Sequence, residues 1–172
     1  MIRFWRTAGA YRWFQSDPEF DHRFRLAFVD THFAAARREL DDWQAASDGC
    51  LALLLLTDQF PRNAFRGSAH MYATDPLARH YAAQAQDAGY MQNVEHDMQL
   101  FFCLPFAHSE EDADQKRSVA LHLKLGEPWL THARGHRNII RRFGRFPHRN
   151  RLLGRETTPE EQSFLDCGGF AG

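Results

Sequence analysis

Apolar side chains recur every three to four residues along most of the chain, whereas runs that alternate apolar and polar residues are few and short. The first spacing is typical of an amphipathic α-helix and the second of a β-strand, so the pattern predicts an all-helical fold. Proline and glycine separate the helical stretches. About seven helices are expected, at residues 18–40, 48–60, 75–89, 94–104, 109–126, 128–145 and from 158 onward.

Local sequence signals mark where several of these helices begin. Asp17 and Asp75 each precede a proline, which is a favoured first residue of a helix. Thr158 opens the sequence TPEE, in which Glu161 occupies the partner position of a capping box. The segment 50–56 is apolar on every side, as expected of a helix at the centre of a bundle.

Length and charge exclude several classes of protein. The chain has 172 residues, which suits a single helical domain over residues 1–172, expected as an antiparallel array. Lys and Arg number 21 against 22 Asp and Glu, so bulk charge favours neither a nucleic-acid partner nor a membrane. No apolar run approaches the length of a membrane span, and the start lacks the pattern of a signal peptide. The three cysteines have no metal-ligand spacing, which predicts reduced thiols, a cytoplasmic location and no bound cofactor.

Charged residues are segregated along the chain. Residues 132–155 contain eight arginines and no acid, and residues 80–115 contain seven acids and no Lys or Arg. Arg134, Arg137, Arg141 and Arg145 are expected on one helix face, where like charges repel. The acids at 110–114 could neutralise this face within the fold. Alternatively the arginines form an anion site, since guanidinium groups suit bidentate recognition of carboxylate or phosphate. A nucleic-acid surface is disfavoured, because few aromatic residues interleave with the arginines.

Histidines supply further candidate chemistry. His132 and His136 have the i, i+4 spacing that lets two imidazoles bind one metal ion, with His108, Glu110 or His148 as a third ligand. Because such pairs arise easily by chance and the HExxH motif is missing, we favour no metal site.

Two residues beside Ser109 could act in acid–base chemistry. Ser109 itself is explained as a helix cap. His108 could act as an acid or base oriented by Glu110. Asp58 and Arg62, four residues apart on a buried helix end, are expected to form a structural pair.

Three segments of the chain together carry a family resemblance. DQFPRNAFRG at 58–67, LPFAHSE at 104–110 and HRNIIRRFGRFPHRNRLLGRETTPEEQSFL at 136–165 resemble the bacterial family known as domain of unknown function 924. The resemblance implies a tetratricopeptide-like helical fold and carries no settled activity. The positions that match the family pattern are Asp58, Gln59, Arg62, Asn63, Arg66, His108, Ser109, Glu110, His136, Arg145, His148, Arg149 and Asn150.

The turns FPRN at 60–63 and FPHRN at 146–150 echo each other, and each presents Arg and Asn donors after an apolar helix. The first hypothesis is therefore a binding module whose two turns converge on one groove for a small anion or an acidic peptide terminus. Its predicted ligand-binding residues are Asp58, Arg62, Asn63, Arg66, His108, Glu110, His136, Arg145, His148, Arg149 and Asn150. One alternative is a hydrolase or transferase acting on a phosphorylated or carboxylated substrate, with His108 or His148 as acid and base. Another is a structural protein that forms homo-oligomers.

Overall fold

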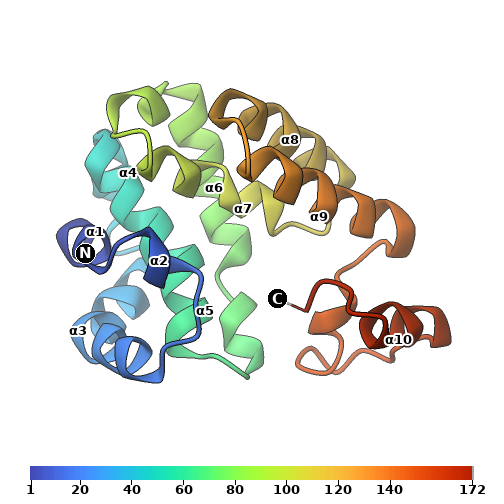
Figure 1. The fold of residues 1–172 in the computed structure, drawn as a ribbon. Coiled ribbons are helices and arrows are strands. Elements are labelled where there is room, and N and C mark those ends of the chain that lie inside the picture. Colours follow the sequence, from blue (N-terminus) through green and yellow to red (C-terminus); the bar gives the residue numbers. More distant parts are fainter. Residues whose placement is uncertain (172) are drawn as a thin grey trace. The chain divides into compact units, whose positions relative to one another are not determined.

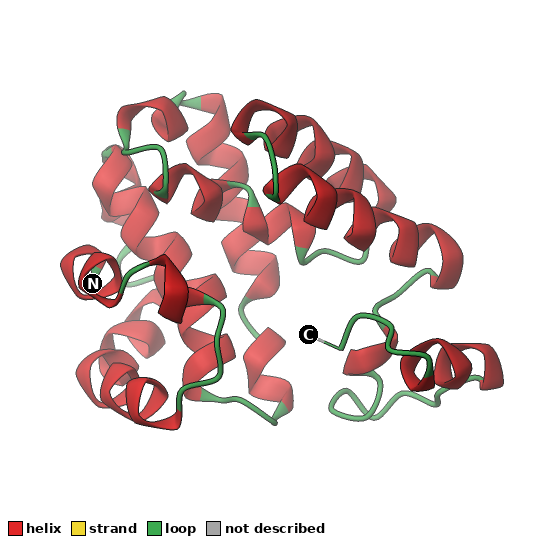
Figure 2. Ribbon diagram, viewed as in Figure 1, coloured by secondary structure: helices red, strands yellow, loops and turns green. Residues whose placement is uncertain are grey.

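A computed structural model describes residues 1–171, in which every regular element is a helix and no strand occurs (Figures 1 and 2). The prediction of an all-helical fold is confirmed. The chain contains two compact units, Met1–Pro105 and the residues from Phe106 onward. The single domain over residues 1–172 and the tetratricopeptide-like arrangement stay predictions. None of the helices in residues 1–171 has the length and apolar character needed to cross a membrane.

The first unit is built around a central buried helix. Its α-helices are α1 (Ile2–Ala8), α2 (Ala10–Trp13), α3 (Pro18–Ala36), α4 (Ser47–Leu54), α5 (Phe60–Ala64) and α6 (Asp75–Asp87). Shorter 3-10 helices are η1 (Asp41–Ala45), η3 (Ala69–Tyr72), η4 (Tyr90–Asn93) and η5 (Met98–Phe102). All residues of 50–60 are buried, and α4 contacts α1, α6 and η5, so it forms the core as the apolar run predicted.

A π-helical turn, η2 (Leu55–Gln59), joins α4 to α5. Its polar residues Thr57, Asp58 and Gln59 are all buried. The Thr57 hydroxyl donates to the Leu53 carbonyl at 2.7 Å, and the Thr57 carbonyl accepts from the Thr74 hydroxyl at 2.6 Å. The wide turn therefore places polar groups inside an otherwise apolar core, a feature that often marks functional sites.

The second unit contains a packed pair of helices, α8 (Asp112–Leu125) and α9 (Trp129–Phe143), followed by η6 (Pro147–Arg149) and α10 (Pro159–Asp166). One buried apolar cluster of this unit consists of Ile139, Ile140 and Phe146, with Phe143 and Phe164 packed against them. The short helix α7 (Leu104–Ala107) spans the residues where the first unit ends and the second begins.

Several predicted helix boundaries are confirmed by their caps. The Asp17 side chain accepts hydrogen bonds from two backbone N–H groups at the start of α3. Thr158 and Glu161 form the expected capping box of α10. Gly135 does not interrupt α9, which runs through it without a break.

Other boundaries were wrong. The helix expected over 18–40 ends at Ala36, because Arg38 adopts a positive φ of 64°. The helix expected over 94–104 is instead the 3-10 helix η5 followed by α7, and α8 begins at Asp112 rather than at 109. Arg145 lies beyond the end of α9, because Gly144 adopts a left-handed conformation with φ 71°. It therefore does not share a helix face with the other arginines of α9.

Candidate functional site

In the first unit, Arg62 of α5 is the centre of a buried ionic network. Its Nη1 atom donates to the Asp58 carbonyl oxygen at 2.7 Å and to Asp75 Oδ1 at 2.8 Å, and it lies 3.2 Å from Asp58 Oδ1. Burial opposes the charge of Arg62, but the two carboxylates outweigh this cost and raise its pKa above the ordinary value. The expected Asp58–Arg62 pair is present, and it includes a second acid, Asp75.

The other two motif residues of this unit share a different carboxylate. The Asn63 side chain donates to Asp21 Oδ1 at 2.7 Å, and Arg66 Nε donates to Asp21 Oδ2 at 2.9 Å. Asp21 lies on α3, so these bonds attach α5 and the turn after it to that helix. Arg62, Asn63 and Arg66 therefore all donate to carboxylates within the unit, and a ligand role for them and for Asp58 stays a prediction.

A pair of histidines lies beside the π-helical turn. His32 is fully buried, with Nδ1 2.9 Å from the Leu56 carbonyl oxygen and Nε2 3.4 Å from His70 Nε2. Burial lowers the pKa of His32, the Leu56 carbonyl partly offsets this, and His70 lowers it further. His32 was not among the predicted site residues, because a lone histidine within an apolar helix carries no signal in the sequence.

In the second unit, two glutamates hold three basic and amide side chains, of which Arg145 and Asn150 were predicted site residues and Arg155 was not. Glu161 accepts both hydrogen bonds of a bidentate pair from Arg145, at 2.6 and 2.8 Å, and a further bond from Asn150 at 3.2 Å. The Arg145 hydrogen bond is the main cause that lowers the pKa of Glu161, to about 2, against the opposing effect of burial. Arg145 and Asn150 thus help to attach α10 to the turn after α9.

Glu110 is a second carboxylate that stabilises the turn after α9. It accepts two hydrogen bonds from Arg155, at 2.7 and 2.9 Å, and one from the Phe146 backbone N–H at 2.8 Å. Burial would raise the pKa of Glu110, but these bonds hold it below its usual value. Glu110 therefore fixes the backbone of the FPHRN turn.

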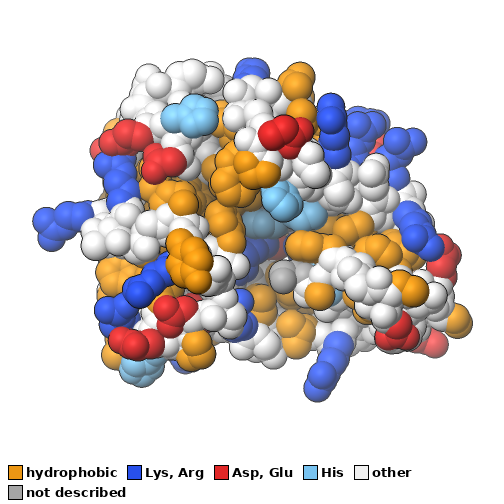
Figure 3. Space-filling model, in the orientation of Figure 1, with side chains coloured by type: hydrophobic (Ala, Val, Ile, Leu, Met, Phe, Trp, Pro, Cys, Tyr) orange, Lys and Arg blue, Asp and Glu red, His pale blue; other side chains and the backbone are white. Residues whose placement is uncertain are grey.

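The arginines of α9 are partly neutralised by acids of the same unit. Arg142 forms an ion pair with Glu160 at 3.0 Å. The pKa of Asp112 is lowered chiefly by its hydrogen bond with Lys116, and further by Arg137 and Arg141. Even so, Figure 3 shows Lys and Arg side chains gathered over α8 and α9.

Three predicted histidines lie close together with aromatic rings in this unit. The His136 ring centroid is 6.5 Å from that of His108, 5.5 Å from that of Phe146 and 4.7 Å from that of Phe170. The His148 ring lies 5.6 Å from Phe146 and 5.1 Å from Phe170. We call His108, His136, His148 and the adjacent Arg149 the histidine cluster.

Electrostatics within the histidine cluster are dominated by basic groups. The pKa of His136 is lowered from 6.5 to about 3, chiefly by burial and in addition by the basic groups of His108, Arg149, His148 and His122. The Nδ1 atom of His136 is buried and has no hydrogen-bond partner. His136 is thus a half-buried imidazole in a basic environment, and one of its ring nitrogens is buried without a hydrogen-bond partner.

The histidines considered above as metal ligands all lie within residues 1–171. No three His, Cys, Asp or Glu side chains there lie so that they could hold a metal ion together. The ring centroid of His132 lies 6.1 Å from that of Trp129, whereas the ring centroid of His136 lies 6.5 Å from that of His108. The Ser109 hydroxyl accepts from the Glu111 N–H at 3.2 Å and donates to Asp114 Oδ2 at 2.7 Å, but the prediction that Ser109 caps the helix was wrong, because α8 begins at Asp112 and Glu111 occupies its N-cap position.

The fold and the two ionic networks define an all-helical protein in which paired Arg, Asn and acidic side chains hold turns in place. A family model described as bacterial protein of unknown function (DUF924) matches residues 1–169, and the chain belongs to this family, as the three motifs indicated. It is similar to a solved protein of unknown function, ATU0120 from Agrobacterium tumefaciens. The two share 55% sequence identity over 97% of this chain and 95% of that chain, with a TM-score of 0.95. Comparison with curated proteins gives no match.

Proposed function

We propose that the protein is a binding module and that the histidine cluster of its second unit binds a small anion, a phosphate or a carboxylate. His136 carries the proposal. Its buried Nδ1 lacks a hydrogen-bond partner, and the groups that act on its pKa are basic. A buried polar atom without a partner costs free energy, which a ligand that bonds to it would recover.

An anion suits this environment better than a cation or a neutral ligand. The positive groups around His136 disfavour its protonation, so a bound negative charge would offset their repulsion and favour the imidazolium form. Arg149 lies with its guanidinium carbon 4.6 Å from the centre of the Phe146 ring, and Phe146 and Phe170 lie against the histidines. Aromatic surroundings lower the local dielectric constant and so strengthen a charge–charge interaction.

The ionic networks support the proposal by supplying a rigid frame. Glu110 holds the Phe146 backbone, and Glu161 holds Asn150 next to Arg149. Because these carboxylates position the turn, Glu110, Arg145 and Asn150 are proposed as positioning residues. His108, His136, His148 and Arg149 are proposed to face the ligand.

The direct test is a titration of the histidine rings by NMR with and without inorganic phosphate or citrate, chloride serving as the control anion. The proposal predicts that a bound anion raises the pKa of His136 by one unit or more, and that a His136→Asn variant loses anion-dependent thermal stabilisation. His22→Asn, an exposed histidine of the first unit, is the matched control and should leave the response unchanged. If neither anion moves the His136 titration or the melting temperature, the proposal is wrong.

The alternatives are separated by different measurements. A hydrolase or transferase that uses His108 or His148 would turn over substrates in a phosphatase and esterase screen. A homo-oligomer would be seen by light scattering across salt concentrations. The shared groove that also includes Asp58, Arg62, Asn63 and Arg66 stays a prediction. It requires that variants of Arg62 change anion affinity as well as stability.

A further inference from the structure

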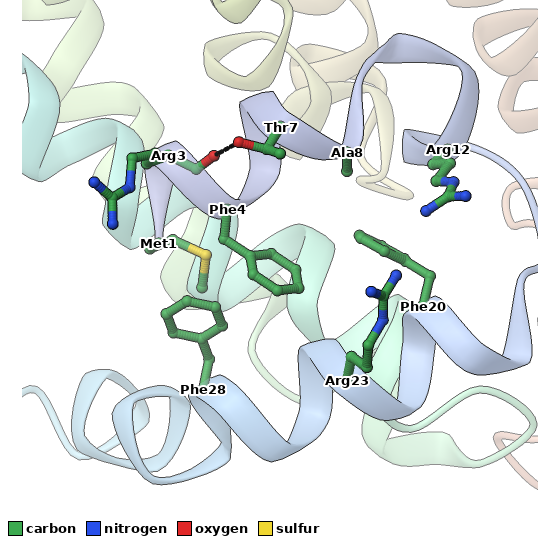
Figure 4. A pocket seen from close by; sticks show the side chains of 9 residues that line it. All are labelled: Met1, Arg3, Phe4, Thr7, Ala8, Arg12, Phe20, Arg23 and Phe28. Carbon is green, nitrogen blue, oxygen red and sulfur yellow. Dashed lines mark hydrogen bonds between the residues drawn. The ribbon is translucent and has the colours of Figure 1, made fainter.

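The first unit has a separate groove between α1, α2 and α3, with a volume of about 470 Å³ (Figure 4). This volume is within the range of small-molecule sites, roughly 300–1,000 Å³. None of the nine described residues that line it is acidic, and three of them are arginines. The groove uses none of the family-motif residues discussed above.

One part of the groove is apolar. Phe4 of α1 packs against Phe20 and Phe28 of α3, with ring centroids 5.7 and 5.3 Å apart. Phe20 is buried, whereas Phe4 and Phe28 are only half-buried and keep part of their rings accessible. A half-buried aromatic wall gains free energy when an apolar ligand covers it.

The other part of the groove is cationic. In Figure 4, Arg12 of α2 and Arg23 of α3 extend from their two helices into the space beside Phe20. Arg12 is 3.9 Å from Asp17, at the limit of an ion pair, and both side chains are substantially exposed. Arg23 has no ion-pair partner among residues 1–171. Two guanidinium groups with so little internal compensation favour an anionic head group.

From this charge complementarity we infer that the groove binds a small amphipathic carboxylate, with its head group at Arg12 and Arg23 and its alkyl chain along Phe4 and Phe28. A free carboxylate is the occupant we commit to, because the groove has the volume of a small-molecule site. This inference is independent of the anion site at the histidine cluster, since the two sites share no residue.

The inference is tested by calorimetric titration of the whole chain with hexanoate, octanoate and decanoate, at concentrations where the ligands do not self-associate. Affinity should rise about two- to fourfold for each added methylene group, as expected for a partly enclosed alkyl chain. Octanol, which lacks the charge, should bind at least about tenfold more weakly than octanoate.

Variants locate the head group. Arg12→Gln and Arg23→Gln should each weaken octanoate binding about tenfold, and the double variant should weaken it further. Arg25→Gln is the matched control. It makes the same charge change on α3, the helix that carries Arg23, at an exposed residue that does not line the groove. It should leave the affinity for octanoate unchanged.

Three results would overturn the inference: no binding of any of the carboxylates, equal binding of octanol and octanoate, or equal affinity in the Arg12, Arg23 and Arg25 variants. Both Arg12 and Arg23 are exposed, so their replacement should not unfold the chain, and the melting temperature of each variant checks this. Failure here leaves the histidine cluster unaffected. The His136→Asn variant should bind octanoate as the parent protein does.

Discussion

Replacing Arg62 by alanine should destabilise the first unit by about 3–5 kcal/mol, the usual cost of removing one partner from a buried ion pair. The side chains of Asp58 and Asp75 are only 2% and 7% exposed, and Arg62 lies within 4 Å of both. Without Arg62, both carboxylates stay buried in the core and lose the ion pairs that this guanidinium makes with them. Since domains of this size are stable by about 5–15 kcal/mol, the loss is a large fraction of the total.

Urea denaturation followed by tryptophan fluorescence measures this effect. Three of the four tryptophans, Trp5, Trp13 and Trp43, lie in the first unit, so the signal reports mainly on its unfolding. The matched control is Arg66→Ala. It removes an arginine of the same motif whose side chain is 42% exposed, and it should cost up to about 1 kcal/mol. Arg62→Lys keeps the charge but loses the forked geometry, so its stability should lie between those of the parent and Arg62→Ala.

A double variant tests whether the loss of stability in Arg62→Ala comes from the buried carboxylates that no longer pair with Arg62. If it does, Arg62→Ala combined with Asp75→Asn should cost less than the sum of the two single changes, by about 0.5–3 kcal/mol. Additive losses would refute this explanation. So would an Arg62→Ala variant that is no less stable than Arg66→Ala.

Four further predictions have defined outcomes. Gly49→Ala should destabilise the fold by about 1–3 kcal/mol in urea denaturation, because its Cβ would overlap the backbone carbonyl oxygen of Trp43. Gly135→Ala should instead stabilise by about 0.5–1 kcal/mol, since it lies within α9 with nothing within 4 Å of the added Cβ, and a loss there would contradict this reasoning. Thr158→Ala should cost about 1 kcal/mol and speed hydrogen exchange in the first turn of α10, whose capping box it removes, whereas unchanged exchange would argue against the cap. Because the pKa of His136 is lowered from its ordinary 6.5 to about 3, the unfolded chain binds the proton first. The free energy of unfolding should therefore fall as the pH drops from about 6.5 toward 3, by at most about 1.4 kcal/mol per pH unit. The His136→Asn variant should show a smaller slope. An equal slope in the variant and the parent protein would contradict the burial of this imidazole.

The elements that the sequence predicted well are those whose signals are local. The cap at Asp17 and the capping box at Thr158 involve residues within three positions of each other, so they can be recognised without knowledge of the fold. The π-helical turn at 55–59 and the 3-10 helix at 98–102 could not be predicted in this way. The apolar pattern of both segments also fits an α-helix, and packing with distant parts of the chain decides their form.

The same distinction holds for the candidate residues. The Asp58–Arg62 pair could be predicted because its partners are one helical turn apart. Asp75, 13 residues from Arg62, was interpreted only as a helix start, although its carboxylate is the second partner of that arginine. Asp21, 45 residues from Arg66, was not considered at all. The sequence indicated which side chains are donors, but their acceptors depend on tertiary contacts.

The hydrogen bonds of the buried carboxylates indicate which basic side chains of each unit are already held by an internal acid. Asp21, Asp58 and Asp75 hold α5 and the residues next to it, and Glu110 and Glu161 hold the FPHRN turn. These acids stabilise the turns by accepting the hydrogen bonds that the arginine and asparagine side chains donate. Two basic side chains are not held by these acids: His136, whose buried Nδ1 has no hydrogen-bond partner, and the exposed Arg23 in the groove of the first unit. Both places lie against aromatic rings, where a bound anion would be less screened by water than on an open surface. In this protein, basic side chains that no internal acid holds, more than the presence of a motif, therefore identify the places where ligand binding should be tested first.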